Sequence, residues 1–259
     1  MSPWWRAAAW GGAAAASLLA GLPAAPAAES PGPAVPFGTP VQNLSAPVED
    51  QHVYAHALLD EFEGRFGSGA NGFRWDGEAW VGSDTNRVWL KSEGFAAVGR
   101  TEGGQHELLY DRPISPYFDL QTGVRYDLDS SAGRGWAAIG VEGLAPQFFE
   151  VSATAYASDA GHFAAKLVGS YEELLTQRLI AEPLLELDLY SRSDPQRQIG
   201  AGLSELDAGV RLRYEIVRKF APYLGVTYDK RFGQTATFAR ANAEPAGALQ
   251  VSIGIRMWL

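Results

Sequence analysis

The sequence predicts an all-β protein: a transmembrane antiparallel up-and-down β-barrel of about twelve strands, preceded by a disordered arm. Two patterns carry this prediction. Segments of about ten residues with alternating polarity recur along most of the chain. The last of them, Val251 to Leu259, alternates apolar residues with Ser252, Gly254 and Arg256. Because strand side chains alternate between two faces, one face suits hydrocarbon and the other tolerates charge. A closing strand of this kind leaves a barrel without an edge.

The first part of the chain predicts export. Residues 1–27 have the features of a signal peptide, with Arg6 before a small apolar stretch and Ala25-Pro26-Ala27 as a cleavage pattern. Residues 28–51 are rich in proline and alanine, so we expect a flexible arm that buries little surface. Residues 52–259 remain for one folded unit, a barrel that would lie in the outer membrane of a Gram-negative cell.

The strands follow one another at regular spacing, with turn clusters such as Gly67-Ser68-Gly69 and Gly82-Ser83-Asp84 between them. Bacterial barrels have an even strand number, and ten strands would result if two weak segments are not strands. The predicted strands are 56–66, 73–82, 86–98, 104–112, 116–128, 134–143, 148–158, 162–173, 178–192, 205–217, 221–232 and 247–259.

Charged residues share one parity of these strands with Trp, Tyr, Ser and Gly, opposite a parity of Leu, Val, Ile, Ala and Phe. A soluble sandwich would turn the charges to water, whereas a membrane barrel turns them to its lumen and its apolar face to lipid. Aromatic residues near strand ends, including Phe73, Tyr117 and Tyr190, suit the two membrane interfaces. Together with export, they favour the barrel.

The composition of the chain argues against several classes of function. The chain has no Cys, which excludes disulfides and thiolate chemistry, and 30 acidic against 21 basic residues argue against a nucleic-acid partner. An outer-membrane hydrolase would present Ser beside His, typically two residues apart on one strand face, but none of the four His residues has Ser two positions on. We therefore expect no enzyme and no organic cofactor.

Several long segments resemble the copper resistance protein B family. They are Phe73 to Gly82 (FRWDGEAWVG), Asn86 to Gly94, Arg112 to Asp127 (RPISPYFDLQTGVRYD), Trp136 to Glu150 (WAAIGVEGLAPQFFE), Leu174 to Arg178 and Leu203 to Tyr223. The resemblance covers 52–259. It implies an outer-membrane barrel of a periplasmic copper-resistance system, with copper ions and outer-membrane lipid as partners.

The arm departs from that family. Family members often carry a Met- and His-rich N-terminal stretch that could hold copper through thioether and imidazole ligands. Here the arm is Pro/Ala-rich, and Met257 is the one Met that remains after the leader. The candidate metal ligands are Glu49, Asp50, His52 and His56. In a strand the two imidazoles would stand roughly 13 Å apart, whereas a helical turn would bring them within about 6 Å. The alternative is a polar barrel rim.

A second set of candidates should line the lumen. It combines both signs of charge, so it could form a cation pathway, or its members could pair across the interior and close it. With Trp80, Trp89 and Tyr156 also inside, we favour a mostly filled lumen. The set is Asp76, Glu78, Lys91, Glu93, Arg125, Glu142, Glu150, Arg211, Arg213, Glu215 and Arg256.

Three functions are therefore open. The first is a barrel that contributes to copper resistance by binding, sequestering or passing copper ions at the periplasmic rim and lumen. The second is a structural barrel that docks a periplasmic multicopper oxidase or copper carrier without a metal site of its own. The third is a small selective pore.

Overall fold

A computed structural model describes residues 52–97, 100–128, 133–159 and 161–259. The predicted leader and the whole predicted arm, with Glu49 and Asp50, lie outside the described residues. Twelve long strands form the barrel: β1 (Tyr54–Gly67), β2 (Gly72–Gly82), β3 (Arg87–Ala97), β4 (Arg100–Pro113), β5 (Phe118–Leu128), β6 (Arg134–Ala145), β7 (Phe149–Ser158), β8 (Phe163–Ser170), β10 (Leu179–Tyr190), β11 (Gly202–Tyr214), β12 (Phe220–Arg231) and β13 (Gly247–Trp258). The short elements are the 3-10 helix η1 (Pro146–Phe148), the two-residue strand β9 (Glu173–Leu174) and helix α2 (Gly233–Ala241).

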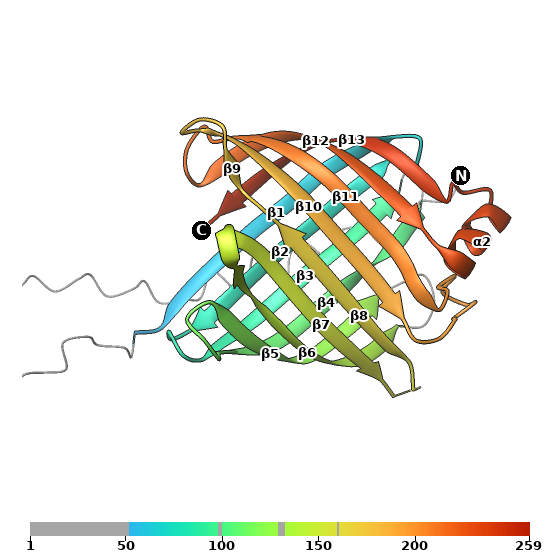
Figure 1. Ribbon diagram of the computed structural model, residues 1–259, viewed down its shortest axis with the longest axis horizontal. Coiled ribbons are helices and arrows are strands. Elements are labelled where there is room, and N and C mark those ends of the chain that lie inside the picture. The colour runs from blue at the N-terminus through green and yellow to red at the C-terminus, as the bar shows by residue number, and fades with distance from the viewer. Residues whose placement is uncertain (1–51, 98–99, 129–132, 160) are drawn as a thin grey trace, which may run out of the picture. The chain divides into compact units, whose positions relative to one another are not determined.

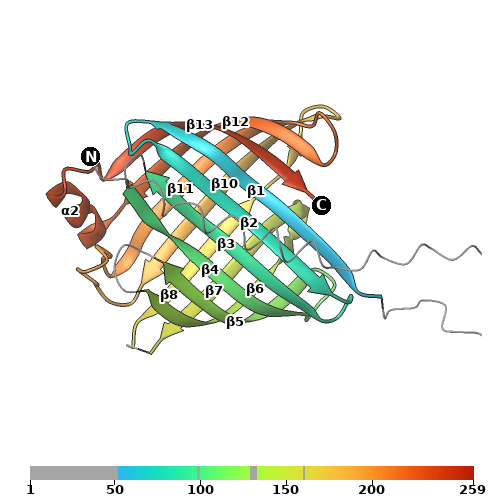
Figure 2. The same cartoon turned by 180° about the vertical axis from the view of Figure 1, so that it is seen from behind.

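The sheet closes on itself. Each long strand pairs antiparallel with its neighbours in sequence, β8 pairs with β10, and β13 returns to pair with β1. Arg65 of β1 lies opposite Ser252 of β13, so the closing strand predicted from its alternation is the strand that seals the barrel. Figures 1 and 2 show the closed sheet from opposite sides. The predicted twelve-stranded antiparallel barrel is confirmed.

The two ends of the barrel differ. β1 begins and β13 ends at one end, whose connections are short turns: 83–86, 114–117, 146–148, 171–178 and 215–219. The opposite end carries the two longest connections, 191–201 and 232–246, and the second of these contains α2 (Figures 1 and 2). Outer-membrane barrels have short periplasmic turns and longer external loops. The end at which β1 begins and β13 ends is therefore the periplasmic end.

Helix α2 was not predicted. It packs at the outer end, where the Thr235 hydroxyl accepts a hydrogen bond from the Gly200 N–H at 2.8 Å and shares another with the Ser204 hydroxyl at 2.7 Å. Ala236 and Ala239 of the helix are buried against the barrel end. Within the described residues no helix has the length and apolar character needed to cross a membrane.

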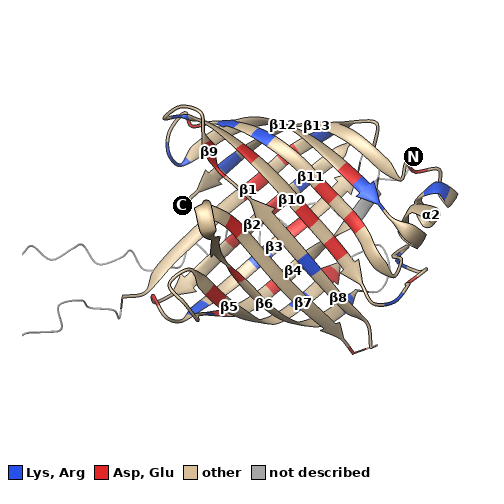
Figure 3. Ribbon diagram, in the orientation of Figure 1, with Lys and Arg blue, Asp and Glu red and all other residues tan. Residues whose placement is uncertain are grey.

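The two faces of the strands have opposite chemistry. In β13, Leu249, Val251 and Ile253 project outward, while Gln250 and Ser252 between them are buried inside. The same alternation recurs around the barrel, whose outer surface presents many large apolar side chains. Figure 3 shows acidic and basic positions distributed along the strands, as a charged lumen requires. A contiguous apolar exterior around a polar interior is the pattern of a barrel in lipid.

Because these side chains face lipid, a charge introduced at one of them should destabilise the barrel more the deeper it lies in the bilayer. We expect Ile253→Arg, near the middle of β13, to lower the free energy of unfolding by about 2–4 kcal/mol, because the guanidinium would face the centre of the bilayer. Leu249→Arg, nearer the outer end of the same strand, should cost about 0–1 kcal/mol. Denaturant unfolding in lipid vesicles checks both variants. Equal costs would contradict the assigned membrane position.

Candidate functional site in the barrel lumen

A β-bulge in β1 brings two successive carboxylates into the lumen. The register with β2 steps from Leu59–Gly77 to Glu61–Asp76, which leaves Asp60 without a partner residue in β2. Strict alternation would turn one of Asp60 and Glu61 to lipid. An extra residue in one strand resets the alternation, so both side chains can point inward.

Arg211 of β11 binds both of these carboxylates. Its Nη2 lies 2.8 Å from Asp60 Oδ2 and 2.6 Å from Glu182 Oε1, and its Nη1 lies 3.2 Å from Glu61 Oε1. The residue is 4% exposed. Arg256 donates to the other oxygen of Asp60 at 2.7 Å. These contacts tie β1 to β10, β11 and β13 inside the barrel, because a buried charge must be compensated by others.

A line of ion pairs crosses the lumen, which we call the ionic septum: Arg74, Glu186, Lys166 and Glu93. Arg74 Nη2 of β2 lies 3.3 Å from Glu186 Oε2 of β10. Lys166 Nζ of β8 lies 2.9 Å from Glu186 Oε1 and also binds Glu93 of β3. The septum joins β2 to β10 and β8 to β3, strands that stand on nearly opposite walls.

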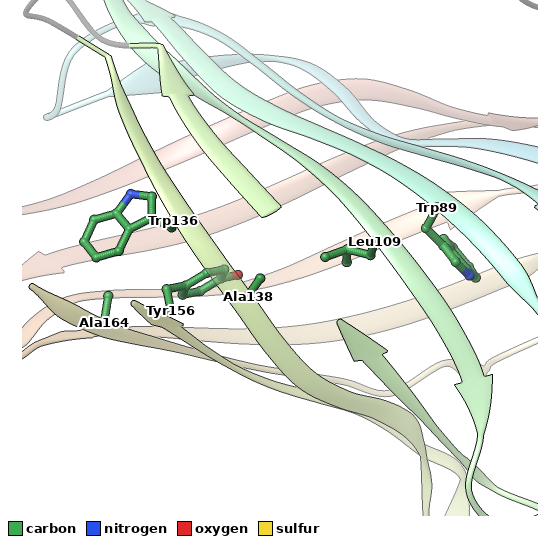
Figure 4. Close-up of a cluster of buried hydrophobic side chains, with 6 residues drawn as sticks. All are labelled: Trp89, Leu109, Trp136, Ala138, Tyr156 and Ala164. Atoms are coloured by element: carbon green, nitrogen blue, oxygen red, sulfur yellow. The ribbon is translucent and has the colours of Figure 1, made fainter. Parts of the chain in front are cut away.

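Aromatic side chains fill another part of the lumen. Trp89, Leu109, Trp136, Ala138, Tyr156 and Ala164 form a buried cluster from β3, β4, β6, β7 and β8 (Figure 4). The guanidinium carbon of Arg125 lies 4.6 Å from the ring centre of Tyr156, within range of a cation–π contact. The Tyr156 hydroxyl donates to Glu107 at 2.7 Å and the Trp136 indole donates to Asp127 at 2.8 Å. The polar atoms of both rings are thus satisfied.

A cavity of about 470 Å³ lies between the septum and the periplasmic end. We call it the vestibule. Its lining includes Glu142 and Leu144 at the end of β6, Glu150 at the start of β7, and Ser170 at the end of β8, all near periplasmic turns.

The vestibule wall is acidic. Ten carboxylates line it: Asp60, Glu61, Asp76, Glu78, Glu93, Glu107, Glu142, Glu150, Glu182 and Glu186. Five basic side chains oppose them: Arg74, Lys91, Lys166, Arg211 and Arg256. Three of the ten carboxylates form no ion pair with a described residue: Asp76, Glu107 and Glu150. Glu107 accepts a hydrogen bond from the Tyr156 hydroxyl at 2.7 Å, and Glu150 accepts one from the Ser170 hydroxyl at 3.4 Å.

The structure places most of the predicted lumen set together. The wall of the vestibule includes Asp76, Glu78, Lys91, Glu93, Glu142, Glu150, Arg211 and Arg256. Lys91 binds Glu142, and Arg213 binds Glu182 at 2.9 Å. Arg125 belongs to the aromatic cluster. Glu215 follows the last residue of β11, and its N–H donates to Arg178 O.

Sequence reasoning missed several members of the network: Asp60, Glu61, Arg65, Arg74, Lys166, Glu182, Glu186 and Asp207. Five of the eight could have been found, because they stand on the charged parity of predicted strands: Arg74, Lys166, Glu182, Glu186 and Asp207.

The predicted rim site is placed only in part. His52 precedes β1, and His56 lies within it, so the chain there is extended and not helical. The His56 ring lies 6.1 Å from the Trp80 ring and 5.8 Å from the Trp258 ring. Across the described part of the chain, no group of three or more His, Asp or Glu residues is arranged to hold a metal ion. Glu49 and Asp50 lie outside that part, so a four-ligand site stays a prediction.

An apolar belt around a closed barrel and a charged lumen define an outer-membrane β-barrel protein. The family model for the copper resistance protein B precursor (CopB) matches residues 53–259. The chain belongs to the copper resistance protein B family, as its sequence motifs predicted.

Two relatives support this membership. Copper resistance protein B of Escherichia coli is 40% identical over 211 residues, which cover 82% of this chain and 71% of the relative. The copper resistance protein B homolog of Pseudomonas syringae pv. tomato is 38% identical over 211 residues, covering 82% and 72%. Among solved structures, the NanC porin superposes with a TM-score of 0.51 at 12% identity, over 79% of this chain and 99% of the porin. That likeness concerns the fold alone. The protein is an outer-membrane barrel with a role in copper resistance.

Proposed function

We propose that this barrel contributes to copper resistance by binding Cu(II) ions at its periplasmic rim and in the vestibule. The observation that carries the proposal is the acidic wall, in which carboxylates outnumber basic side chains by ten to five. In a partly desolvated cavity, an excess of one sign raises the local concentration of the opposite ion. The ligands on offer are carboxylates, with His52 and His56 at the rim, and these suit Cu(II) better than Cu(I).

Each ion would take only a few carboxylate or imidazole ligands and keep part of its hydration shell. Such binding is weak and exchangeable, as suits sequestration or handover of copper ions.

The absence of a preformed metal group in the described residues favours a second candidate. In it, the barrel docks a periplasmic multicopper oxidase or copper carrier and binds no copper itself. The third, a small pore, is disfavoured because the ionic septum crosses the lumen.

Copper tolerance of cells tests the proposal. In cells that lack the chain, the wild type should restore growth in copper. His52→Ala/His56→Ala and Asp76→Asn/Glu150→Gln should each restore less. Asp76 and Glu150 are suited to this test because neither pairs with a described basic residue, so neutralising them leaves no buried cation unpaired.

The control is Asp159→Asn/Glu205→Gln, which removes two charges at the outer end, outside the vestibule. Glu205 lies 3.6 Å from Arg231, which keeps its 2.7 Å contact with Glu244 in this variant. The control should restore full growth. If all three variants match the wild type at equal amounts in the outer membrane, copper is not bound at these places and the docking role is favoured.

A further inference from the structure

We propose that the lumen is a blind, cation-attracting vestibule open at the periplasmic end, and that the ionic septum closes it toward the outside. The inference concerns any small cation and does not depend on the proposed binding of copper.

The septum reaches across the barrel, whereas the other ion pairs mostly follow the wall. Four strands separate β2 from β10 on the shorter path, and four separate β3 from β8. Lys166 is the central member, because it binds Glu186 from the adjacent strand and Glu93 from the far wall. By comparison, Arg87 of β3 binds Asp111 of β4 at 3.4 Å and Asp119 of β5 at 3.0 Å, along one side.

The two sides of the septum are packed differently. On the periplasmic side the vestibule leaves side chains partly accessible, with Glu142 32% and Glu78 25% exposed. On the outer side, Arg65, Arg125 and Trp136 do not line the vestibule and are each at most 4% exposed. Arg65 there binds Glu63 and Asp207, at 2.5 and 2.7 Å. The vestibule therefore extends from the septum toward the periplasmic end.

The charge of the vestibule determines which solutes enter it. With ten carboxylates against five basic side chains, the wall attracts cations and repels anions. Removing Arg74 and Lys166 would widen the passage and make its wall more acidic. A lumen opened in this way should therefore conduct cations.

Conductance in planar bilayers tests the proposal. Folded wild-type barrel, recognised by its heat-dependent gel migration, should show no channels. Arg74→Ala/Lys166→Ala should show discrete channels, with a reversal potential in a KCl gradient that marks preference for K⁺ over Cl⁻. Arg87→Ala is the matched control, because its ion pairs run along the wall, and it should stay silent.

Three results would contradict the proposal. Channels in the wild type would mean that the lumen is not closed. Silence of the folded septum variant would mean that the septum is not the closure. Channels without cation preference would mean that the vestibule does not select by charge.

If the double variant does not fold, a single substitution tests the same closure. The chain has no Cys, so Lys166→Cys creates a single thiol. Its thiolate attacks 2-aminoethyl methanethiosulfonate, forming a protein disulfide that carries an ammonium group and releasing methanesulfinate. We expect Lys166→Cys to conduct, the aminoethyl group to close the channel by restoring the cation, and methyl methanethiosulfonate to leave it open. Equal closure by both reagents would show a steric effect and contradict the ion-pair closure.

Discussion

Arg211→Ala is expected to lower the free energy of unfolding by about 3–5 kcal/mol, the cost of leaving buried charges without their partner. Arg211 contacts Asp60, Glu61 and Glu182, all within 3.2 Å. Its guanidinium carbon also lies 5.5 Å from the ring centre of Tyr223. Alanine would remove the cation that these three carboxylates share. Denaturant unfolding in detergent micelles or vesicles measures the loss.

Two further variants separate charge from geometry. Arg211→Lys keeps the positive charge but loses the planar fork that reaches several carboxylates, so its loss should be intermediate. Arg218 lies in the exposed turn between β11 and β12, so Arg218→Ala serves as the control. It should change the free energy of unfolding by about 0.5 kcal/mol or less. An Arg211→Ala barrel as stable as Arg218→Ala would contradict the role of Arg211 in joining the strands.

The strands could be predicted from the sequence because polar and apolar residues alternate along most of them. In β13, outward Val251 and Ile253 flank inward Ser252, and the sequence alone assigned these faces. The bulge in β1 could not be predicted in this way. Asp60 and Glu61 are adjacent, and only the register with β2 reveals that both face inward.

Helix α2 lacked the usual local signals. It begins at Gly233, has no side-chain cap, and contains two Thr residues, so its sequence favours a helix only weakly. Its hydrogen bonds reach Gly200 and Ser204, which are 35 and 31 residues away from Thr235. Tertiary contact therefore outweighs local preference here.

The candidate site, like the fold, could be predicted from the sequence only in part. Alternation indicates that Glu93 and Lys166 face the lumen, but it does not indicate that they meet. They are 73 residues apart, and Arg74 and Glu186 are 112 apart. Such pairs depend on the stagger of the strands around the closed barrel, which alternation does not encode. The sequence thus predicts a charged interior, and the structure adds the septum and the vestibule.

Copper binding by the refolded barrel should depend on both proposed places. For the wild type we expect saturable Cu(II) binding near one ion per chain, tighter than zinc binding because Cu²⁺ binds N/O ligands more strongly. Cu(I) should bind less well, since one Met remains after the leader and there is no Cys. Asp76→Asn/Glu150→Gln should weaken the affinity for Cu(II) about tenfold, a loss of about 1.4 kcal/mol.

The most direct test of the account is therefore this titration, with Cu(II), Cu(I) and zinc added separately to folded protein in detergent. Saturable Cu(II) binding that weakens in Asp76→Asn/Glu150→Gln, and in His52→Ala/His56→Ala, but not in Asp159→Asn/Glu205→Gln, is the result predicted here. Wild-type binding no stronger than that of zinc, or binding unchanged in all three variants, would contradict a copper-binding lumen and rim.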